Sequence, residues 1–185
     1  MQDLPSKKYS VIYADPPWKY SDIKSGTGVG VKHHYSCLTN KEICEIPVGN
    51  VTEQDSALFM WTTSPFLEQS FSIISAWGFK YKCVAFTWMK KYSPSGKLVF
   101  GPGNYTRGNA EFCLLGIKGR LKVQSRSVPA AILSFREKHS KKPDEVRTRI
   151  EQLYGDVARL ELFARERAPG WYSLGNQLDQ TIKED

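Results

Sequence analysis

The sequence lacks the features that would assign it to a membrane, disulfide-stabilised or zinc-binding class. No apolar run approaches the roughly 20 residues that cross a bilayer, and the N-terminal segment has no apolar signal-peptide core. The four cysteines are scattered, and no two of them form a Cys-x-x-Cys pair. We therefore expect reduced, mostly buried thiols, no metal, no membrane association and a cytoplasmic location.

The chain also has no internal repeat, no low-complexity tract and no linker that would divide it. Its 185 residues are enough for one domain with a sizeable core, so we expect a single domain over residues 1–185. The formal net charge is +7 and the isoelectric point is about 9.2. A basic domain is compatible with a nucleic-acid partner, although any one basic cluster can equally be a solvated surface.

Hydrophobic periodicity predicts strands and helices that alternate along the chain. Strands are predicted at 9–14, 57–62, 81–89, 112–118 and 157–164, and helices at 39–46, 64–77, 143–154 and 176–182. This alternation is typical of an α/β fold with a mostly parallel, doubly wound sheet. Ligands of such sheets bind beyond the carboxyl ends of the strands, so we expect the residues after 14 and after 163 to share one rim.

The most specific local feature is Asp15-Pro16-Pro17-Trp18, which follows the first predicted strand. Each proline has a fixed φ and restricts the residue before it, so the turn is stiff and its carbonyl groups can point outward. Asp15 can accept a hydrogen bond from an exocyclic amine, and Trp18 offers a ring for stacking. This chemistry suits a flat nucleobase, whereas the alternative is an ordinary turn after a strand with a core tryptophan.

Further strings in a fixed order extend this motif. With them, the chain resembles the DPPW family of S-adenosylmethionine-dependent adenine N-methyltransferases, which includes the catalytic subunit of the eukaryotic mRNA adenosine methyltransferase and many bacterial and phage members. The resemblance covers nearly the whole chain. The matching strings include His34-Tyr35, Leu58-Phe59-Met60-Trp61, Trp88-Met89-Lys90, Asn109-Ala110-Glu111, Lys141-Lys142-Pro143-Asp144-Glu145, Leu160-Glu161-Leu162-Phe163-Ala164-Arg165 and Gly175-Asn176.

The resemblance implies a Rossmann-like methyltransferase domain that binds S-adenosylmethionine, and it implies roles for individual residues. Asp15, Pro16, Pro17 and Trp18 would hold the target amine, and Tyr35 would lie beside the base. Tyr105 and Arg107, on a long loop at 90–108, are further candidates for substrate binding. The implied cofactor-binding residues are Lys142, Glu161, Phe163, Arg165, Asn176 and Gln177. Structural alternatives stay open: Glu161 as half of an ion pair, Phe163 as a core residue and Asn176 as a helix cap.

The expected reaction is methylation of the 6-amino group of adenine, in DNA because the chain is compact like bacterial and phage members. The same chemistry on RNA is one alternative, and a catalytically silent nucleic-acid-binding subunit is another. The intact Asp-Pro-Pro-Trp motif argues against the silent subunit. A homodimer or a partner subunit is possible. We also expect the basic residues at 90–91, 107, 118–120 and 138–142 to form one face around the pocket and to bind phosphates.

Overall fold

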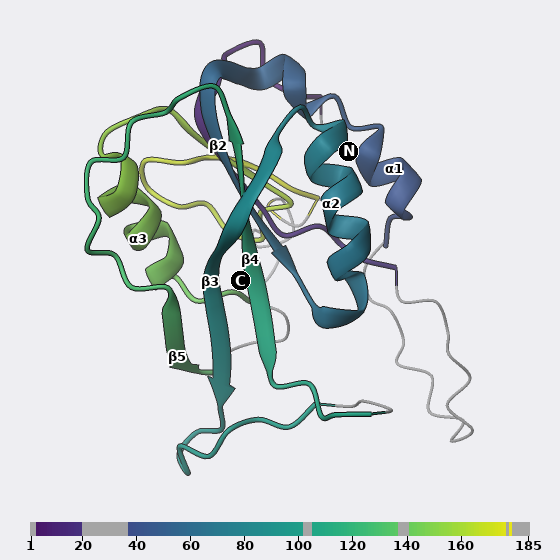
Figure 1. The fold of residues 1–185 in the computed structure, drawn as a ribbon, viewed down its shortest axis with the longest axis vertical. Coiled ribbons are helices and arrows are strands. Elements are labelled where there is room, and N and C mark those ends of the chain that lie inside the picture. Colours follow the sequence, from purple (N-terminus) through teal and green to yellow (C-terminus); the bar gives the residue numbers. More distant parts are fainter. Residues whose placement is uncertain (1–2, 20–36, 102–104, 137–140, 177, 179–185) are drawn as a thin grey trace, which may run out of the picture.

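Seven strands of the described chain form one sheet. Their order across the sheet is β5 (Ala131–Phe135), β3 (Lys80–Lys91), β4 (Ala110–Lys118), β2 (Thr52–Thr62), β1 (Tyr9–Ala14), β6 (Arg159–Leu162) and β7 (Tyr172–Leu174). The computed structural model describes residues 3–19, 37–101, 105–136, 141–176 and 178 (Figure 1). Tyr35, Gln177 and most of the predicted closing helix at 176–182 lie outside these residues.

The sheet is mixed, because one strand runs against all the others. β1 is parallel to β2 and β6, β6 is parallel to β7, and β3 is parallel to β5. β4 is antiparallel to both of its neighbours, β2 and β3. Consequently Phe112, near the start of β4, lies beside Thr62 at the carboxyl end of β2, whereas Lys118 lies beside Ser56. The first residues of β4 therefore reach the same rim as the carboxyl ends of the parallel strands.

Helices cover both faces of the sheet, as Figure 1 shows. The helices α1 (Asn40–Cys44) and α2 (Leu67–Ala76) lie on one face, and α3 (Glu145–Tyr154) lies on the other. The described chain also has two short 3-10 turns, η1 (Val48–Val51) and η2 (Ser64–Phe66). A capping box begins α1, since Thr39 and Glu42 exchange hydrogen bonds between side chain and backbone.

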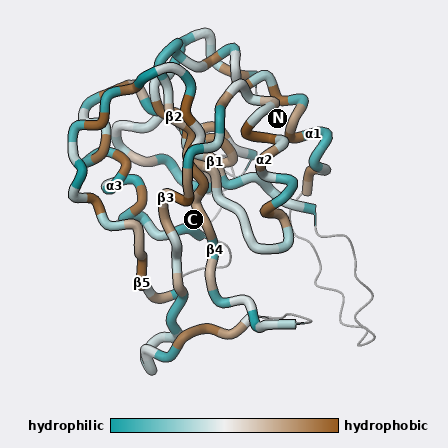
Figure 2. Tube along the Cα trace, viewed as in Figure 1, coloured by the Kyte–Doolittle hydropathy of each residue, from teal (hydrophilic) through white to brown (hydrophobic). Residues whose placement is uncertain are grey.

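The core consists of two hydrophobic clusters, one on each face, and β1 contributes to both. Ile12 and Ala14 pack in the cluster under α1 and α2, while Val11 and Tyr13 pack in the cluster under α3. Alternation of side chains along a strand places them on opposite faces. Figure 2 shows the hydrophobic segments gathered along the central strands. The described residues thus form a single α/β domain, which confirms the predicted class.

Several element boundaries differ from the predictions. β5 and β7 were not predicted, and β6 is shorter than the predicted strand at 157–164. The predicted helix at 64–77 begins with η2, whose N-cap is Thr63, and Thr63 makes no side-chain capping bond. The predicted loop at 90–108 starts with a short pairing of Lys91 with Leu98. No helix in the described part of the chain is long and apolar enough to span a membrane.

Candidate active site

The Asp-Pro-Pro-Trp segment forms a tight turn directly after β1. The N–H of Trp18 donates to the carbonyl of Pro16 at 2.9 Å, and the N–H of Leu38 donates to the carbonyl of Pro17 at 2.9 Å. The N–H of Lys19 in turn donates a hydrogen bond to the carbonyl of Leu38. Backbone pairing therefore fixes the turn against the segment that precedes α1, and Asp15 projects from a rigid position on the rim.

Asp15 is bound by Lys142, which lies 127 residues further along the chain. The Lys142 Nζ is 2.7 Å from Asp15 Oδ2 and 3.3 Å from Glu111 Oε2, while Lys90 contacts Glu111 Oε1. The four side chains form a row of alternating charge. Their exposed fractions are 20% for Asp15, 11% for Lys142, 14% for Glu111 and 22% for Lys90, so water screens the row only partly.

The electrostatics of this row keep its inner members charged. Burial lowers the pKa of Lys142, but the carboxylates of Asp15 and Glu111 raise it by more, so the pKa lies above its ordinary value. Burial raises the pKa of Glu111, but Lys142 and Lys90 lower it further, so the pKa lies below its ordinary value. Near neutral pH both groups are therefore ionised.

Two indole rings support the lysines of the row. The Lys142 Nζ is 5.7 Å from the ring centroid of Trp61, and the Lys90 Nζ is 4.6 Å from that of Trp88. Both distances are in the range of a cation–π interaction. Both rings belong to the cluster under α3, so the charged row lies at the rim end of that cluster.

Glu111 is a site residue that sequence reasoning missed, and Lys90, which was expected among the basic residues around the pocket, contacts it. Both belong to strings that match the family, but the direction of β4 decides whether Glu111 reaches the rim. Because β4 is antiparallel to β3, Glu111 pairs with Trp88 near the carboxyl end of β3. The family match pointed to the string that contains Glu111, but only the direction of β4 shows that Glu111 lies at the rim.

Trp18 is directed into the protein. Its ring stacks on Phe66 with centroids 5.0 Å apart and an interplanar angle of 13°, and it packs against the cluster under α1 and α2. Its Nε1 is buried and has no hydrogen-bond partner in the described chain. One face of the ring is thus covered by Phe66, and a base can stack only on the other face.

The second predicted segment lies at the end of β6, next to β1 in the sheet. Phe163 has a φ of 62°, and among the described residues it is the only non-glycine residue with a positive φ. Such strain in a non-glycine residue clusters at functional sites. Beside it, the N–H of Ala164 donates to the carbonyl of Leu174 at 2.8 Å, and a Cβ added to Gly175 would overlap the backbone of Ala164. The ends of β6 and β7 therefore meet with no room for a side chain.

Glu161, on β6, pairs with Arg147 of α3. The Arg147 Nε is 2.8 Å from Glu161 Oε2 and its Nη2 is 2.9 Å from Oε1, so both carboxylate oxygens are bound. Burial raises the pKa of Glu161, and the bonds from Arg147 only partly offset this. This geometry is the ion-pair alternative stated for Glu161, with an arginine as its partner.

The remaining candidates are partly or wholly exposed. Arg165 is half-buried after β6, Asn176 is exposed after β7, and Tyr105 and Arg107 are exposed in the segment before β4. Tyr35 and Gln177 lie outside the described residues. The structure therefore brings together Asp15, Lys142 and Glu111 by direct contact, and it brings the segment after β6 to the same rim through the pairing of β1 with β6.

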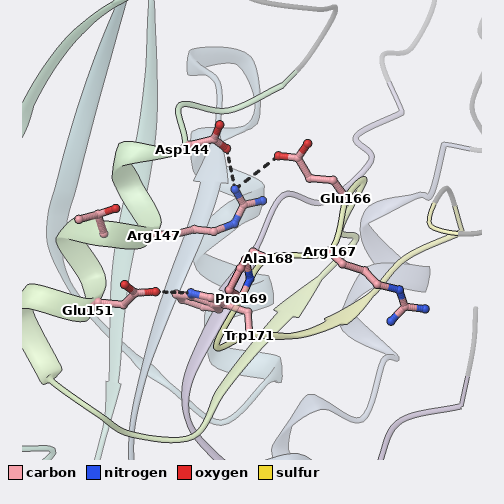
Figure 3. A pocket seen from close by; sticks show the side chains of 9 residues that line it. Asp144, Arg147, Glu151, Glu166, Arg167, Ala168, Pro169 and Trp171 are labelled. Carbon is pink, nitrogen blue, oxygen red and sulfur yellow. Dashed lines mark hydrogen bonds and ion pairs between the residues drawn. The ribbon is translucent and has the colours of Figure 1, made fainter. Parts of the chain in front are cut away.

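A separate polar pocket of about 360 Å³ lies between α3 and the segment at 166–171 (Figure 3). Inside it, Arg147 bonds Asp144 at 2.8 Å, and the Nε1 of Trp171 donates to Glu151 at 2.7 Å. None of the predicted cofactor-binding residues lines this pocket. The lining residues are Asp144, Arg147, Thr148, Glu151, Glu166, Arg167, Ala168, Pro169 and Trp171.

One part of the predicted basic face is wrong. Lys118 is the last residue of β4 and Arg120 comes just after it, so both lie at the end of the sheet opposite Asp15, because β4 is antiparallel. There Lys118 donates to Thr52 Oγ1 at 2.8 Å, and the N–H of Arg120 donates to Asp55 Oδ1 at 2.7 Å. Lys90 and Lys91 lie at the carboxyl end of β3, as predicted, and 138–140 lies outside the described residues.

Comparison with known proteins agrees with this geometry. The MT-A70 family profile matches residues 9–177. The type II methyltransferase M.MunI of Mycoplasma sp is 37% identical over 95% of this chain and 80% of its own length. The human N(6)-adenosine-methyltransferase catalytic subunit METTL3 is 28% identical over 93% of this chain, which spans 28% of that protein. The MT-A70-like N(6)-adenosine-methyltransferase of Arabidopsis thaliana is 29% identical over 92% of this chain and 24% of its own length.

The family profile covers nearly all of the chain, and it includes both rim segments and the charged row between them. The resemblance that the sequence motifs indicated is therefore confirmed. The chain belongs to the MT-A70 family of S-adenosylmethionine-dependent adenine methyltransferases.

Proposed function

We propose that this chain is a cytoplasmic bacterial or phage methyltransferase that methylates the 6-amino group of adenine in DNA, with residues 1–185 as one catalytic domain of Rossmann-like type. The observation that carries the proposal is the Asp15 carboxylate, held by Lys142 on a rigid Pro-Pro turn at the carboxyl end of a central strand. The intact Asp-Pro-Pro-Trp motif and the partly buried charged row beside it favour an active enzyme over a catalytically silent subunit.

The rim of β6 and β7 fits the cofactor. Phe163 is held in a strained conformation there, Gly175 lets two backbone segments meet, and the buried Oγ of Ser173 has no hydrogen-bond partner in the described chain. When bound, S-adenosylmethionine supplies an electrophilic methyl group. Glu161 would help to position the cofactor indirectly, because its pairing with Arg147 fixes the segment at the end of β6. The residues that we expect to hold the cofactor are Lys142, Phe163, Arg165, Asn176 and Gln177.

The chain's own residues would orient the adenine amine. Lys142 binds Asp15 through Oδ2, so Oδ1 can accept a hydrogen bond from the amine. The Pro16 carbonyl already accepts from Trp18, but a carbonyl oxygen has a second lone pair for the other amine hydrogen. Both contacts hold the amine hydrogens, fix the position of the nitrogen and leave its lone pair free to face the methyl group of the bound cofactor. As the nitrogen gains positive charge, the Asp15 carboxylate would stabilise it, and the nitrogen then releases one proton to Asp15 or to water.

The choice of DNA rests on the type II methyltransferase M.MunI, because the match covers 80% of that protein. The relatives named N(6)-adenosine-methyltransferases favour RNA as the second candidate, but this chain spans only about a quarter of their length. In a duplex the adenine must leave the base stack before it can reach Asp15, which costs about a few kcal/mol. A single-stranded substrate avoids that cost.

The test is methyl transfer from labelled S-adenosylmethionine to single-stranded DNA, duplex DNA and RNA of one sequence, followed by digestion to nucleosides. We expect label in N6-methyldeoxyadenosine. Asp15→Asn should reduce transfer by at least roughly a hundredfold, since it removes the charge that stabilises the reacting nitrogen. Calorimetry should show that this variant binds S-adenosylhomocysteine within a few-fold of the wild type.

Each other outcome has a defined meaning. Label only in RNA would favour the second candidate, and label in cytosine would contradict the proposed reaction. Binding of nucleic acid and cofactor product without transfer would identify a silent subunit. Full activity of Asp15→Asn would remove Asp15 from the mechanism.

A further inference from the structure

We propose that Lys90 is a positioning residue for methyl transfer, which acts through Glu111 to keep Lys142 against Asp15. This inference rests on the proposed function, because it concerns the same site. Lys90 contacts neither Asp15 nor its turn in the described structure. Its influence passes through two charged contacts, Lys90 to Glu111 and Glu111 to Lys142.

The geometry of Glu111 makes this influence specific. Each of its carboxylate oxygens carries one lysine, Oε1 for Lys90 and Oε2 for Lys142. Lys142 is in turn shared between two carboxylates, and it lies closer to Asp15, at 2.7 Å, than to Glu111, at 3.3 Å. The position of Lys142 therefore depends on how strongly each carboxylate attracts it.

Lys90 neutralises part of the charge of Glu111, the carboxylate that competes with Asp15 for Lys142. A buried carboxylate that loses one of its two cations is costly, so it draws the remaining cation closer. Without Lys90, Glu111 would attract Lys142 more strongly, and the contact of Lys142 with Asp15 would lengthen. Asp15 would then lose the bond that fixes its orientation toward the amine.

Lys90 itself is held by three strands that do not carry the Asp-Pro-Pro-Trp motif. It lies on β3 two residues after Trp88, so the side chains of Lys90 and Trp88 are on the same face of the sheet. Trp88 pairs with Glu111 of β4, so the Glu111 side chain is on that face as well. The Lys90 ammonium lies over the Trp88 ring, and on the other side Lys90 pairs with Ser134 of β5. The β3–β4–β5 part of the sheet thus supplies one end of the charged row.

The first test is a double-mutant cycle on kcat. Lys90→Met removes the charge and keeps a long apolar stem over Trp88, and we expect kcat to fall roughly tenfold, the scale of one lost charge-assisted hydrogen bond. Adding Glu111→Gln removes the competing charge, so the double variant should recover activity relative to Lys90→Met alone. Lys90→Arg should stay within about threefold of the wild type, because it keeps the cation.

A merely structural Lys90 would give a different pattern, in which the losses of Lys90→Met and Glu111→Gln add. That result, or a wild-type kcat for Lys90→Met, would overturn the inference. Lys82→Ala is the matched control, because this lysine is exposed on the same strand away from the row, and we expect unchanged kcat. If the wild type itself transfers no methyl group, the proposed function fails. Urea unfolding of the same variants then still tests whether Lys90 acts through Glu111.

The second test needs no activity. Urea unfolding of the same variants measures the coupling between Lys90 and Glu111 in the protein without ligand. We expect Lys90→Met to lower the unfolding midpoint clearly in the wild-type background and little in the Glu111→Gln background. Equal shifts in both backgrounds would show that Lys90 does not act through Glu111.

Discussion

At the scale of single residues, the site depends on one ammonium group held between two carboxylates. Asp15 lies in the turn after β1 and Glu111 lies on β4, and each alone would be a partly buried charge without adequate solvation. Lys142 offsets both charges at once, so removing it would leave two like charges at the rim. The candidate cofactor-binding lysine therefore also positions Asp15, the proposed catalytic carboxylate, and we expect substitutions of Lys142 to affect both properties.

The same row predicts a pH dependence of stability. The pKa of Glu111 in the folded protein lies below its ordinary value of 4.5, so its ion pairs stabilise the fold fully above that pH and less as the pH falls toward the lowered pKa. The difference in unfolding free energy between wild type and Glu111→Gln should therefore shrink as the pH is lowered from 6 to below about 4.5.

Urea denaturation at a series of pH values measures this difference. Glu68→Gln is a suitable control, because Glu68 lies on α2, away from the charged row. A difference that does not change with pH would mean that Glu111 is not stabilised in its ionised form.

At the scale of elements, local signals predicted what local chemistry determines. The apolar run of β1, the Thr39 capping box of α1 and the spacing of Val146 and Ile150 in α3 are each visible in a short window of sequence. β5 and β7 are short strands at the edges of the sheet, and their pairing depends on β3 and β6 rather than on their own pattern.

The site likewise combines features that are visible in the sequence with contacts that only the folded chain shows. Asp15 was predicted from its motif, and Lys142 from the family match, but neither source predicted their direct contact or the place of Glu111. The place of Glu111 depends on the direction of β4, and the contact of Asp15 with Lys142 depends on how the segment before α3 packs against the turn after β1. Contacts between residues 127 positions apart are not encoded in any local pattern.

The junction of β6 and β7 gives a prediction at this scale. Gly175→Ala places a Cβ into the backbone of Ala164, so we expect a loss of about 1–3 kcal/mol in unfolding free energy, typical of overpacking, and weaker binding of S-adenosylhomocysteine. Gly49→Ala is the matched control, because its nearest neighbour would be 3.6 Å away. Thermal unfolding and calorimetry measure the two effects, and equal behaviour of both variants would contradict the close contact.

At the scale of the whole molecule, the positive charge divides between two ends of the sheet. Lys91 and Arg107 belong to the segments around the carboxyl end of β3 and the start of β4, whereas Lys118 and Arg120 lie at the opposite end. Only the first group is placed to contact phosphates of a nucleic acid whose adenine reaches Asp15.

This division predicts different salt responses. Affinity for DNA should fall steeply with salt, and Lys91→Ala with Arg107→Ala should reduce the slope of log K against log salt by roughly one to two, since each phosphate contact contributes about 0.9. Lys118→Ala with Arg120→Ala should leave the slope unchanged. Fluorescence anisotropy at several salt concentrations measures the slope for each double variant. Equal slopes would show that the position of a cation at one or the other end of the sheet does not determine whether it binds phosphate.

The reversed direction of β4 also has a practical consequence. A strand of nine residues is about 30 Å long, at roughly 3.4 Å per residue, so one end of β4 marks the reacting rim and the other end is remote from it. The exposed Lys122, just past the remote end, is therefore a position where a fluorophore or a surface tether can be attached without obstructing the rim. Single-molecule recordings of the immobilised enzyme would observe an unhindered site.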